Sequence, residues 1–138
     1  EAENRRVQPW EHPWTVVTMA PDGSWGAATE PYIYQAIAKA VSNCRRMSSQ
    51  KIGCGAQLSV IRFGWTIALR CGKTNIIAAE QSIAAAESAA ADREKTLRLA
   101  QAENLPPCSR VVTVNPNGNV IPAPAAIDRP DVAASAPN

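Results

Sequence analysis

The order of apolar and polar positions predicts a β-hairpin near the start of the chain. A β-branched and aromatic run, WTVVTMA, occupies residues 14–20, and a second short run, WGAATE, occupies residues 25–30. Asp22-Gly23 stands between them, and this pair favours a two-residue turn with positive φ. Pairing about that turn would place Met19 opposite Gly26.

A second hairpin is predicted around Phe63-Gly64, which separates the apolar runs AQLSVIRF and WTIALRC. A two-residue turn at this point would set Leu58 against Leu69 on one face of the pair. A helix laid across that face would complete an α+β layer.

Helical spacing of apolar residues predicts two helices. The first follows Pro31, a residue that suits a first helical turn, and carries Ile33, Ile37 and Cys44 on one side. The second is expected over residues 75–103, with an apolar face composed mostly of alanine. Small side chains allow close approach, so we expect this helix to pack tightly on the sheet or on the first helix. The fold class is therefore α+β: a small antiparallel sheet of two β-hairpins packed against two helices, with extended terminal arms.

Composition changes this picture little. The 138 residues carry a formal net charge of +2 and fit one domain. The basic residues are scattered along the chain, so we do not expect nucleic acid as a partner. The longest apolar stretch is interrupted by Glu80 and Glu87, so we expect no direct membrane span.

The four cysteines indicate two disulfides in an oxidising compartment. Their spacings of 10, 17 and 37 residues do not match the paired cysteines of zinc sites or redox motifs. Three pairings are possible. Cys44 closes a helix and Cys54 opens the next strand, so we expect these two to pair, leaving Cys71 to join Cys108. The chain begins at Glu1 without methionine, as it would after removal of a signal peptide, and a periplasmic or secreted location is expected.

The predicted organisation has three parts. Residues 1–13 form an extended arm, residues 14–103 form the disulfide-stapled domain, and residues 104–138 form a Pro/Ala-rich tail with a short hairpin at 110–121. Arms of this kind suit wrapping along a larger protein. We expect partner contacts from six of their residues: Val7, Pro9, Trp10, Val120, Ile121 and Pro122.

The residue content argues against an enzyme. His12, the single histidine, lies in the Pro-rich arm, which is a poor place for a general base. No pair of carboxylates forms a convincing acid and base, and no calcium loop is present. We therefore expect no catalytic residues, no metal site and no cofactor.

Several motifs together resemble a family of small secreted bacterial proteins of unknown function. They are W-T-V-V-T-M-A, D-G-S-W-G-A-A, a helix ending in Cys44, G-C at 53–54 and R-C-G at 70–72. Members of that family show a W-x-A-I-A hairpin and an Ala-rich helix ending in cysteine. The resemblance covers about residues 14–90, implies the fold and brings no catalytic residues. The longer loop before Cys54, the long second helix and the Cys108 tail depart from it.

By size, secretion and cysteine content the chain is also similar in type to the small periplasmic subunits of membrane-bound quinohaemoprotein alcohol dehydrogenases. That similarity implies that haem and quinone belong to the partner, because this chain has no C-x-x-C-H motif. We thus expect a non-catalytic accessory subunit of a larger envelope complex. The alternative is a free-standing binding module that recognises a glycan or a protein through exposed tryptophans, drawn from Trp10, Trp14, Trp25 and Trp65.

Overall fold

The computed structural model describes residues 12–48, 52–101 and 104–123. Within them the α+β class is confirmed, with two helices, two small antiparallel sheets and two disulfides. The elements follow one another as β1 (Trp14–Met19), β2 (Trp25–Glu30), α1 (Ile33–Met47), β3 (Gln57–Arg62), β4 (Trp65–Cys71), β5 (Thr74–Glu80), α2 (Ile83–Gln101), β6 (Cys108–Val114) and β7 (Val120–Pro122).

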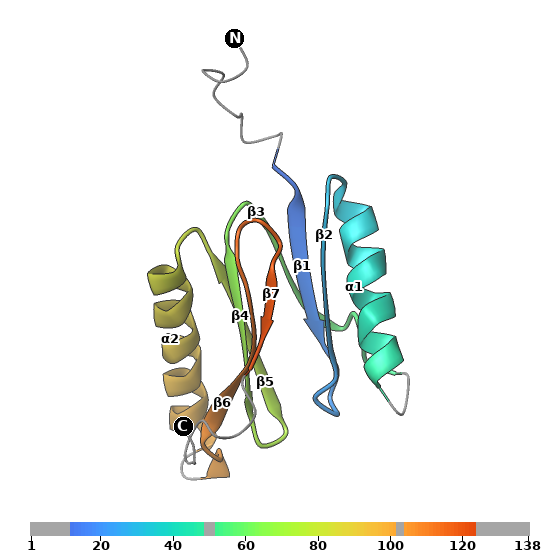
Figure 1. Ribbon diagram of the computed structural model, residues 1–138. Helices are drawn as coiled ribbons and strands as arrows, with labels where there is room; N and C mark the ends of the chain where they lie inside the picture. Colours follow the sequence, from blue (N-terminus) through green and yellow to red (C-terminus); the bar gives the residue numbers. More distant parts are fainter. Residues whose placement is uncertain (1–11, 49–51, 102–103, 124–138) are drawn as a thin grey trace.

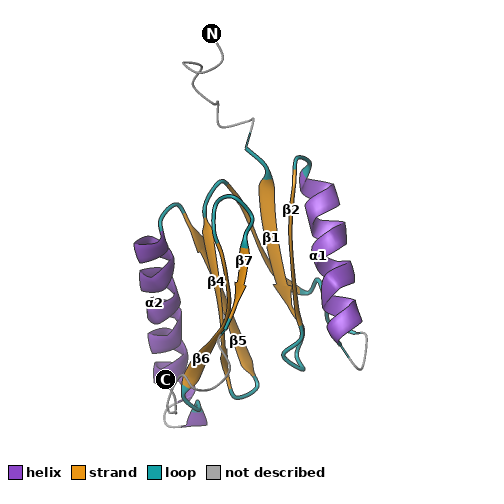
Figure 2. Ribbon diagram, in the orientation of Figure 1, coloured by secondary structure: helices purple, strands orange, loops and turns teal. Residues whose placement is uncertain are grey.

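These elements stack in four layers (Figure 1). The first sheet has the strand order β2-β1-β3 and the second has the order β5-β4-β6-β7. The sheets lie between the helices, with α1 outside the first sheet and α2 outside the second, as the colouring by secondary structure makes plain (Figure 2). One sheet was expected and two are present.

Three apolar clusters hold the layers together. Val16 of β1 packs with Ala36 and Ala40 of α1. Ile76 of β5 packs with Ala90 of α2. The third cluster lies between the two sheets and consists of Val17, Met19, Ala68, Ile77, Val112 and Val114. Because β1 and β4 are covered on both faces, consecutive residues are buried along each strand instead of alternate ones.

The first hairpin is present, but its predicted register is wrong by one residue. Met19 lies opposite Trp25, not Gly26. The Gly23 N–H donates a hydrogen bond to the Ala20 carbonyl, and the φ of Gly23 itself is 92°. The loop therefore has three residues instead of two. As a result Trp25 packs against the cluster between the sheets.

The predicted second hairpin is wrong. β3 pairs with β1, while β4 pairs with β5 and β6, so Leu58 does not face Leu69. Phe63-Gly64 instead carries the chain from one sheet to the other. Residues 75–80, expected as helix, form β5, and α2 begins only at Ile83. Ile76 is buried under α2, and the adjacent Ile77 is buried between the sheets. Burial of two successive residues is what a strand covered on both faces requires.

The chain contains an internal repeat. β1-β2-α1-β3 and β4-β5-α2-β6 have the same order, and in each unit the first strand is central. In both units the opening Trp lies opposite the closing Glu of the next strand, Trp14 with Glu30 and Trp65 with Glu80. The helices begin three residues later and bury alanines at the same steps, namely Ala36 and Ala40 in α1 and Ala86 and Ala90 in α2.

Both predicted disulfides are confirmed. Cys44 at the end of α1 joins Cys54 before β3, with a Cα–Cα distance of 5.9 Å. Cys71 and Cys108 are opposite residues of β4 and β6. The second bond therefore ties β6, which lies in the range expected as tail, into the second sheet. Val112 and Val114 are fully buried, so the domain extends at least to β6.

Candidate functional site

The expected partner-binding residues of the C-terminal part lie together on one strand. Val120, Ile121 and Pro122 form β7, and all three side chains are exposed, Val120 by 40% and Ile121 by 51%. β7 pairs with β6 and is the last strand of the second sheet. The expected contacts Val7, Pro9 and Trp10 lie outside the described residues.

A well-ordered turn positions β7. The side chain of Asn115 accepts hydrogen bonds from the N–H groups of Asn117 and Asn119, and the Gly118 N–H donates to the Asn115 carbonyl. Gly118, with a φ of 87°, lies against Thr29 of β2, where an added Cβ would stand 2.7 Å from the Thr29 Oγ1. The turn therefore lies against the first sheet.

The outer edge of β7 offers few backbone groups. Along an antiparallel strand the backbone N–H and C=O groups of successive residues point alternately toward the neighbouring strand and away from it. Because the Asn119 carbonyl accepts from the Asn115 N–H, Asn119 faces β6, and the backbone groups of Val120 and Pro122 face outward. Pro122 has no N–H to donate, which leaves Val120 as the one outward donor of this strand. Contact with a partner would thus rest mainly on apolar side chains and only slightly on added strand pairing.

The described tryptophans are partly buried and contribute to packing. The Arg62 guanidinium lies over the Trp14 ring, 4.3 Å from its centroid. Trp25 packs against the cluster between the sheets, and Trp65 is half-buried at the start of β4. Trp10 is outside the described residues.

Among the described aromatic side chains, the most exposed are two tyrosines that sequence reasoning missed. Tyr32 is 69% exposed and Tyr34 is 81% exposed. Both flank Ile33 at the start of α1, and their positions off the apolar stripe were the signal available in the sequence. Residues two apart on a helix do not share a face, so the pair forms no single platform.

One ionisable group stands out by its hydrogen bonds. The Asp22 carboxylate accepts from the Ser24 N–H at 2.9 Å and from the Ser48 hydroxyl at 3.0 Å. The hydrogen bonds from Ser24 contribute most to lowering the pKa of Asp22 below its ordinary value, with smaller contributions from Ser48 and the nearby Arg70 charge. This carboxylate joins the β1–β2 turn to the end of α1.

The same turn is also held by the second sheet. The Arg70 guanidinium donates to the Pro21 carbonyl at 3.1 Å, and the Asn75 side-chain amide donates to the Ala20 carbonyl at 2.8 Å. Arg70 and Asn75 are opposite residues of β4 and β5. The polar groups around Asp22 therefore connect three elements of the fold.

The described residues include the four cysteines and the single histidine of the chain. All four cysteines are in disulfides. In the three described ranges no three His, Cys, Asp or Glu side chains are grouped so that they could hold a metal ion. The His12 ring stacks on Phe63, with 3.7 Å between the ring centroids. No helix among the described residues is long and apolar enough to cross a bilayer.

Comparisons of the chain with protein-family models, with curated proteins and with solved structures found no match in any of the three.

Proposed function

We propose that this protein is a non-catalytic accessory subunit of a larger bacterial envelope complex, such as a membrane-bound dehydrogenase, and that it docks onto its partner through β7 together with the N-terminal arm. The observation that carries the proposal is that Val120 and Ile121 are exposed apolar residues, one on each face of a strand that is hydrogen-bonded at the edge of a sheet.

Rigid presentation favours binding. The backbone of β7 is already paired with β6, and the Ala123 N–H donates to the Val111 carbonyl just beyond the strand. Little backbone entropy is therefore lost when a partner covers these side chains. Full burial of an Ile side chain contributes about 1.5–3 kcal/mol, which is a useful share of a protein–protein binding free energy.

The two disulfides support a place outside the cytosol, because such bonds persist in oxidising compartments. We place the protein in the periplasm, where both an envelope partner and an oxidising environment are present. Haem or quinone would belong to the partner.

A photocrosslinking experiment in the native host tests the docking surface. A benzophenone amino acid is placed at Ile121 or, as a control, at Leu99, which is an apolar side chain 79% exposed on α2. We expect irradiation to give one larger adduct from position 121 and none from position 99. Mass spectrometry of the adduct identifies the partner.

A matched pair of variants tests the same surface by co-purification under mild detergent. Ile121→Asp should release the partner found by crosslinking, and Leu99→Asp should retain it in the wild-type stoichiometry. The proposal is wrong if the native protein elutes from envelope extracts as a monomer and position 121 yields no adduct.

The alternative, a free-standing module that recognises a glycan through exposed tryptophans, has less support. It would need an open aromatic platform, and the described Trp rings are partly buried while Tyr32 and Tyr34 do not share a face. Binding of the isolated protein to a glycan array, with quenching of Trp fluorescence, would favour it.

A further inference from the structure

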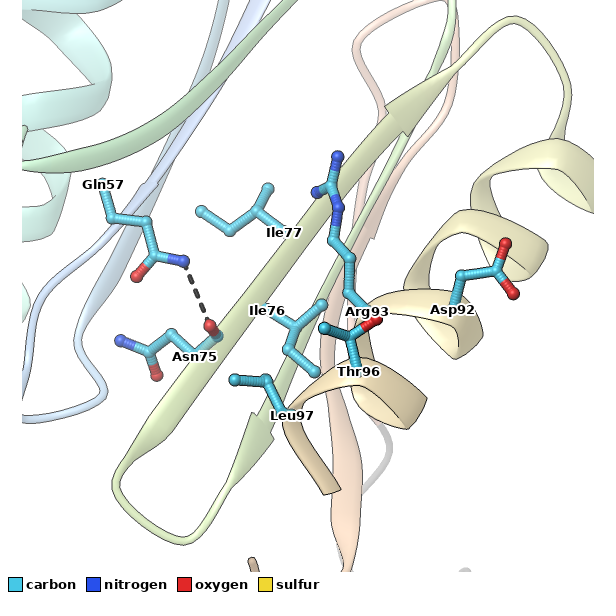
Figure 3. A pocket seen from close by; sticks show the side chains of 8 residues that line it. All are labelled: Gln57, Asn75, Ile76, Ile77, Asp92, Arg93, Thr96 and Leu97. Atoms are coloured by element: carbon cyan, nitrogen blue, oxygen red, sulfur yellow. Dashed lines mark hydrogen bonds between the residues drawn. The ribbon is translucent and has the colours of Figure 1, made fainter. Parts of the chain in front are cut away.

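A slot with a volume of about 380 Å³ runs along the outer edge of β5, at the opposite edge of the second sheet from β7 (Figure 3). One wall is the part of α2 that carries Arg93, Thr96 and Leu97, and the other wall is Gln57 at the start of β3. Because α2 and the first sheet cover opposite faces of the second sheet, the slot lies where a fifth strand of that sheet would run.

The backbone of β5 is arranged to receive such a strand. β4 and β5 are joined by a two-residue turn that pairs Cys71 with Thr74. The alternation of an antiparallel ladder then turns the N–H and C=O groups of Asn75, Ile77 and Ala79 away from β4. No hydrogen bond from another described strand reaches Ile77 or Ala79.

An amide already occupies one position of this edge. The Gln57 side chain donates from Nε2 to the Asn75 carbonyl at 3.1 Å, inside the slot. This carbonyl is one of the outward groups, so a side-chain amide takes the place that a backbone N–H of an added strand would take. The edge is thus geometrically able to accept hydrogen bonds from an incoming chain.

The slot also contains an unpaired positive charge. Arg93 extends from α2 along β5 toward Ile77, while the neighbouring Asp92 points away from it (Figure 3). Nearby carboxylates on the helix are already paired, Glu94 with Arg98 at 2.7 Å and Glu87 with Arg110 at 3.0 Å. Arg93 has no ion-pair partner among the described residues.

We propose that the β5 edge binds an extended segment of a partner protein as an added strand, with an acidic side chain of that segment paired to Arg93. Main-chain hydrogen bonds to Ile77 and Ala79 would hold the segment, and the Arg93 charge would select it. A second copy of this chain is a poor occupant. Pairing of two β5 strands about Ile77 would bring two Arg93 guanidinium groups together.

The test uses synthetic seven-residue peptides of alternating Thr and Val, blocked at both ends, with either Glu or Lys at the centre. We expect the Glu peptide to shift the backbone amide NMR signals of Ile77 and Ala79 in the intact protein and to slow their exchange with solvent. The Lys peptide should bind about tenfold more weakly, because it loses a charge-assisted pair.

Two variants with the same change in net charge complete the test. Arg93→Glu should weaken binding of the Glu peptide about tenfold and strengthen binding of the Lys peptide. Arg45→Glu, at an exposed position of α1, should leave both affinities unchanged. Thermal unfolding verifies that both variants fold. The inference is overturned if millimolar peptide leaves the Ile77 and Ala79 signals unmoved, if Arg93→Glu binds as wild type does, or if the free protein sediments as a dimer in which the Ile77 and Ala79 amides already exchange slowly. Since Val120 and Ile121 are unchanged in every variant, failure here leaves docking through β7 standing.

Discussion

At the scale of single residues, the Asp22 carboxylate shows how a polar group stabilises this fold. It accepts hydrogen bonds from Ser24 and Ser48, which belong to different segments, and these bonds are stronger to the ionised form. Its pKa is therefore lowered in the folded protein relative to the unfolded chain. A lowered pKa stabilises the folded state at pH values above the unfolded pKa, and this contribution is lost as the pH falls through the folded pKa.

We predict that Asp22→Asn lowers the midpoint of urea unfolding at pH 7 and that the difference from wild type shrinks as the solution is acidified from about pH 4 to about pH 2. Asp92→Asn, on the exposed surface of α2, serves as the matched control and should change the midpoint little. A difference between wild type and Asp22→Asn that stays constant over this range would contradict the assigned hydrogen bonds.

Gly26 is a second residue whose identity the packing determines. A Cβ added there would overlap the Ala40 carbonyl oxygen and the Cys44 backbone nitrogen of α1, neither of which is the flexible end of a side chain. β2 and α1 therefore approach as closely as they do because residue 26 has no side chain.

Substitution of this glycine should consequently be costly. We predict that Gly26→Ala lowers the free energy of unfolding by at least about 1–3 kcal/mol, because the helix must move away from the strand. Urea titration followed by far-UV circular dichroism measures the change. Ser42→Ala, on the exposed side of α1, is the reference, and equal stability of the two variants would show that the helix moves at no cost.

At the scale of elements, the alanine face of α2 has the same role as Gly26 has in β2. Ala86 is fully buried and Ala90 is 3% exposed, and Ala90 packs on Ile76, Ala78 and Leu105. The sequence predicted a small-residue face and close packing on the sheet or on the first helix, and the structure places it on the sheet. Ile83 and Leu97, the larger residues of the same stripe, are only partly buried.

A pair of adjacent substitutions tests this packing. Ala90→Leu should cost about 1–3 kcal/mol of unfolding free energy through overpacking, whereas Ala91→Leu, on the exposed side of the helix, should be nearly neutral. Thermal unfolding of the two variants compares them directly. If Ala91→Leu is the more damaging change, α2 is rotated relative to its described position.

Sequence reasoning succeeded for elements with a local signature. The strands around Asp22-Gly23, the helix that carries Cys44 and both disulfides follow from turn chemistry, periodicity and chain distance. The first register was wrong because Asp22-Gly23 fits both a two-residue and a three-residue loop. β5 was missed because Ile76, Ile77 and Ala78 fit a helical spacing as well as a buried strand, and only the second sheet decides between them.

The repeat is visible in the sequence. The pairs Trp14-Thr15 and Trp65-Thr66 stand 51 residues apart, and Glu30 and Glu80 stand 50 apart, which is the signature of a duplicated unit. The repeat predicts β5 as a strand, because β5 has the same place in the second unit as β2 has in the first. For the candidate site, the apolar character of Val120 and Ile121 was visible in the sequence. Their exposure was not, because it depends on which strand ends the sheet.

At the scale of the whole molecule, the two repeated units depend on each other. Each unit covers one face of its sheet with its own helix, and the other face is covered only by the opposite sheet. Val17 and Met19 of the first unit and Ala68 and Val112 of the second are almost completely buried in that interface. Neither unit alone therefore hides its apolar surface.

We predict that residues 1–64 and residues 65–138, produced separately, are not folded monomers. Their NMR spectra should lack the dispersion of the intact chain, or the fragments should self-associate through the exposed sheet faces. Mixing the two under oxidising conditions should restore the dispersed spectrum. A well-dispersed spectrum from monomeric residues 1–64 would show that the unit is stable by itself.

The position of Cys108 has a consequence for the timing of biogenesis. A chain that leaves the ribosome or the translocation channel from its N-terminus presents Cys44 and Cys54 first, and they are only 10 residues apart. Cys71 follows and then waits for 37 more residues, which takes about 2–7 s at the usual rate of synthesis. If the first pair has already closed, the waiting thiol has no wrong partner within its own chain. The order in which the cysteines emerge thus favours the native pairing without requiring a search among the three alternatives.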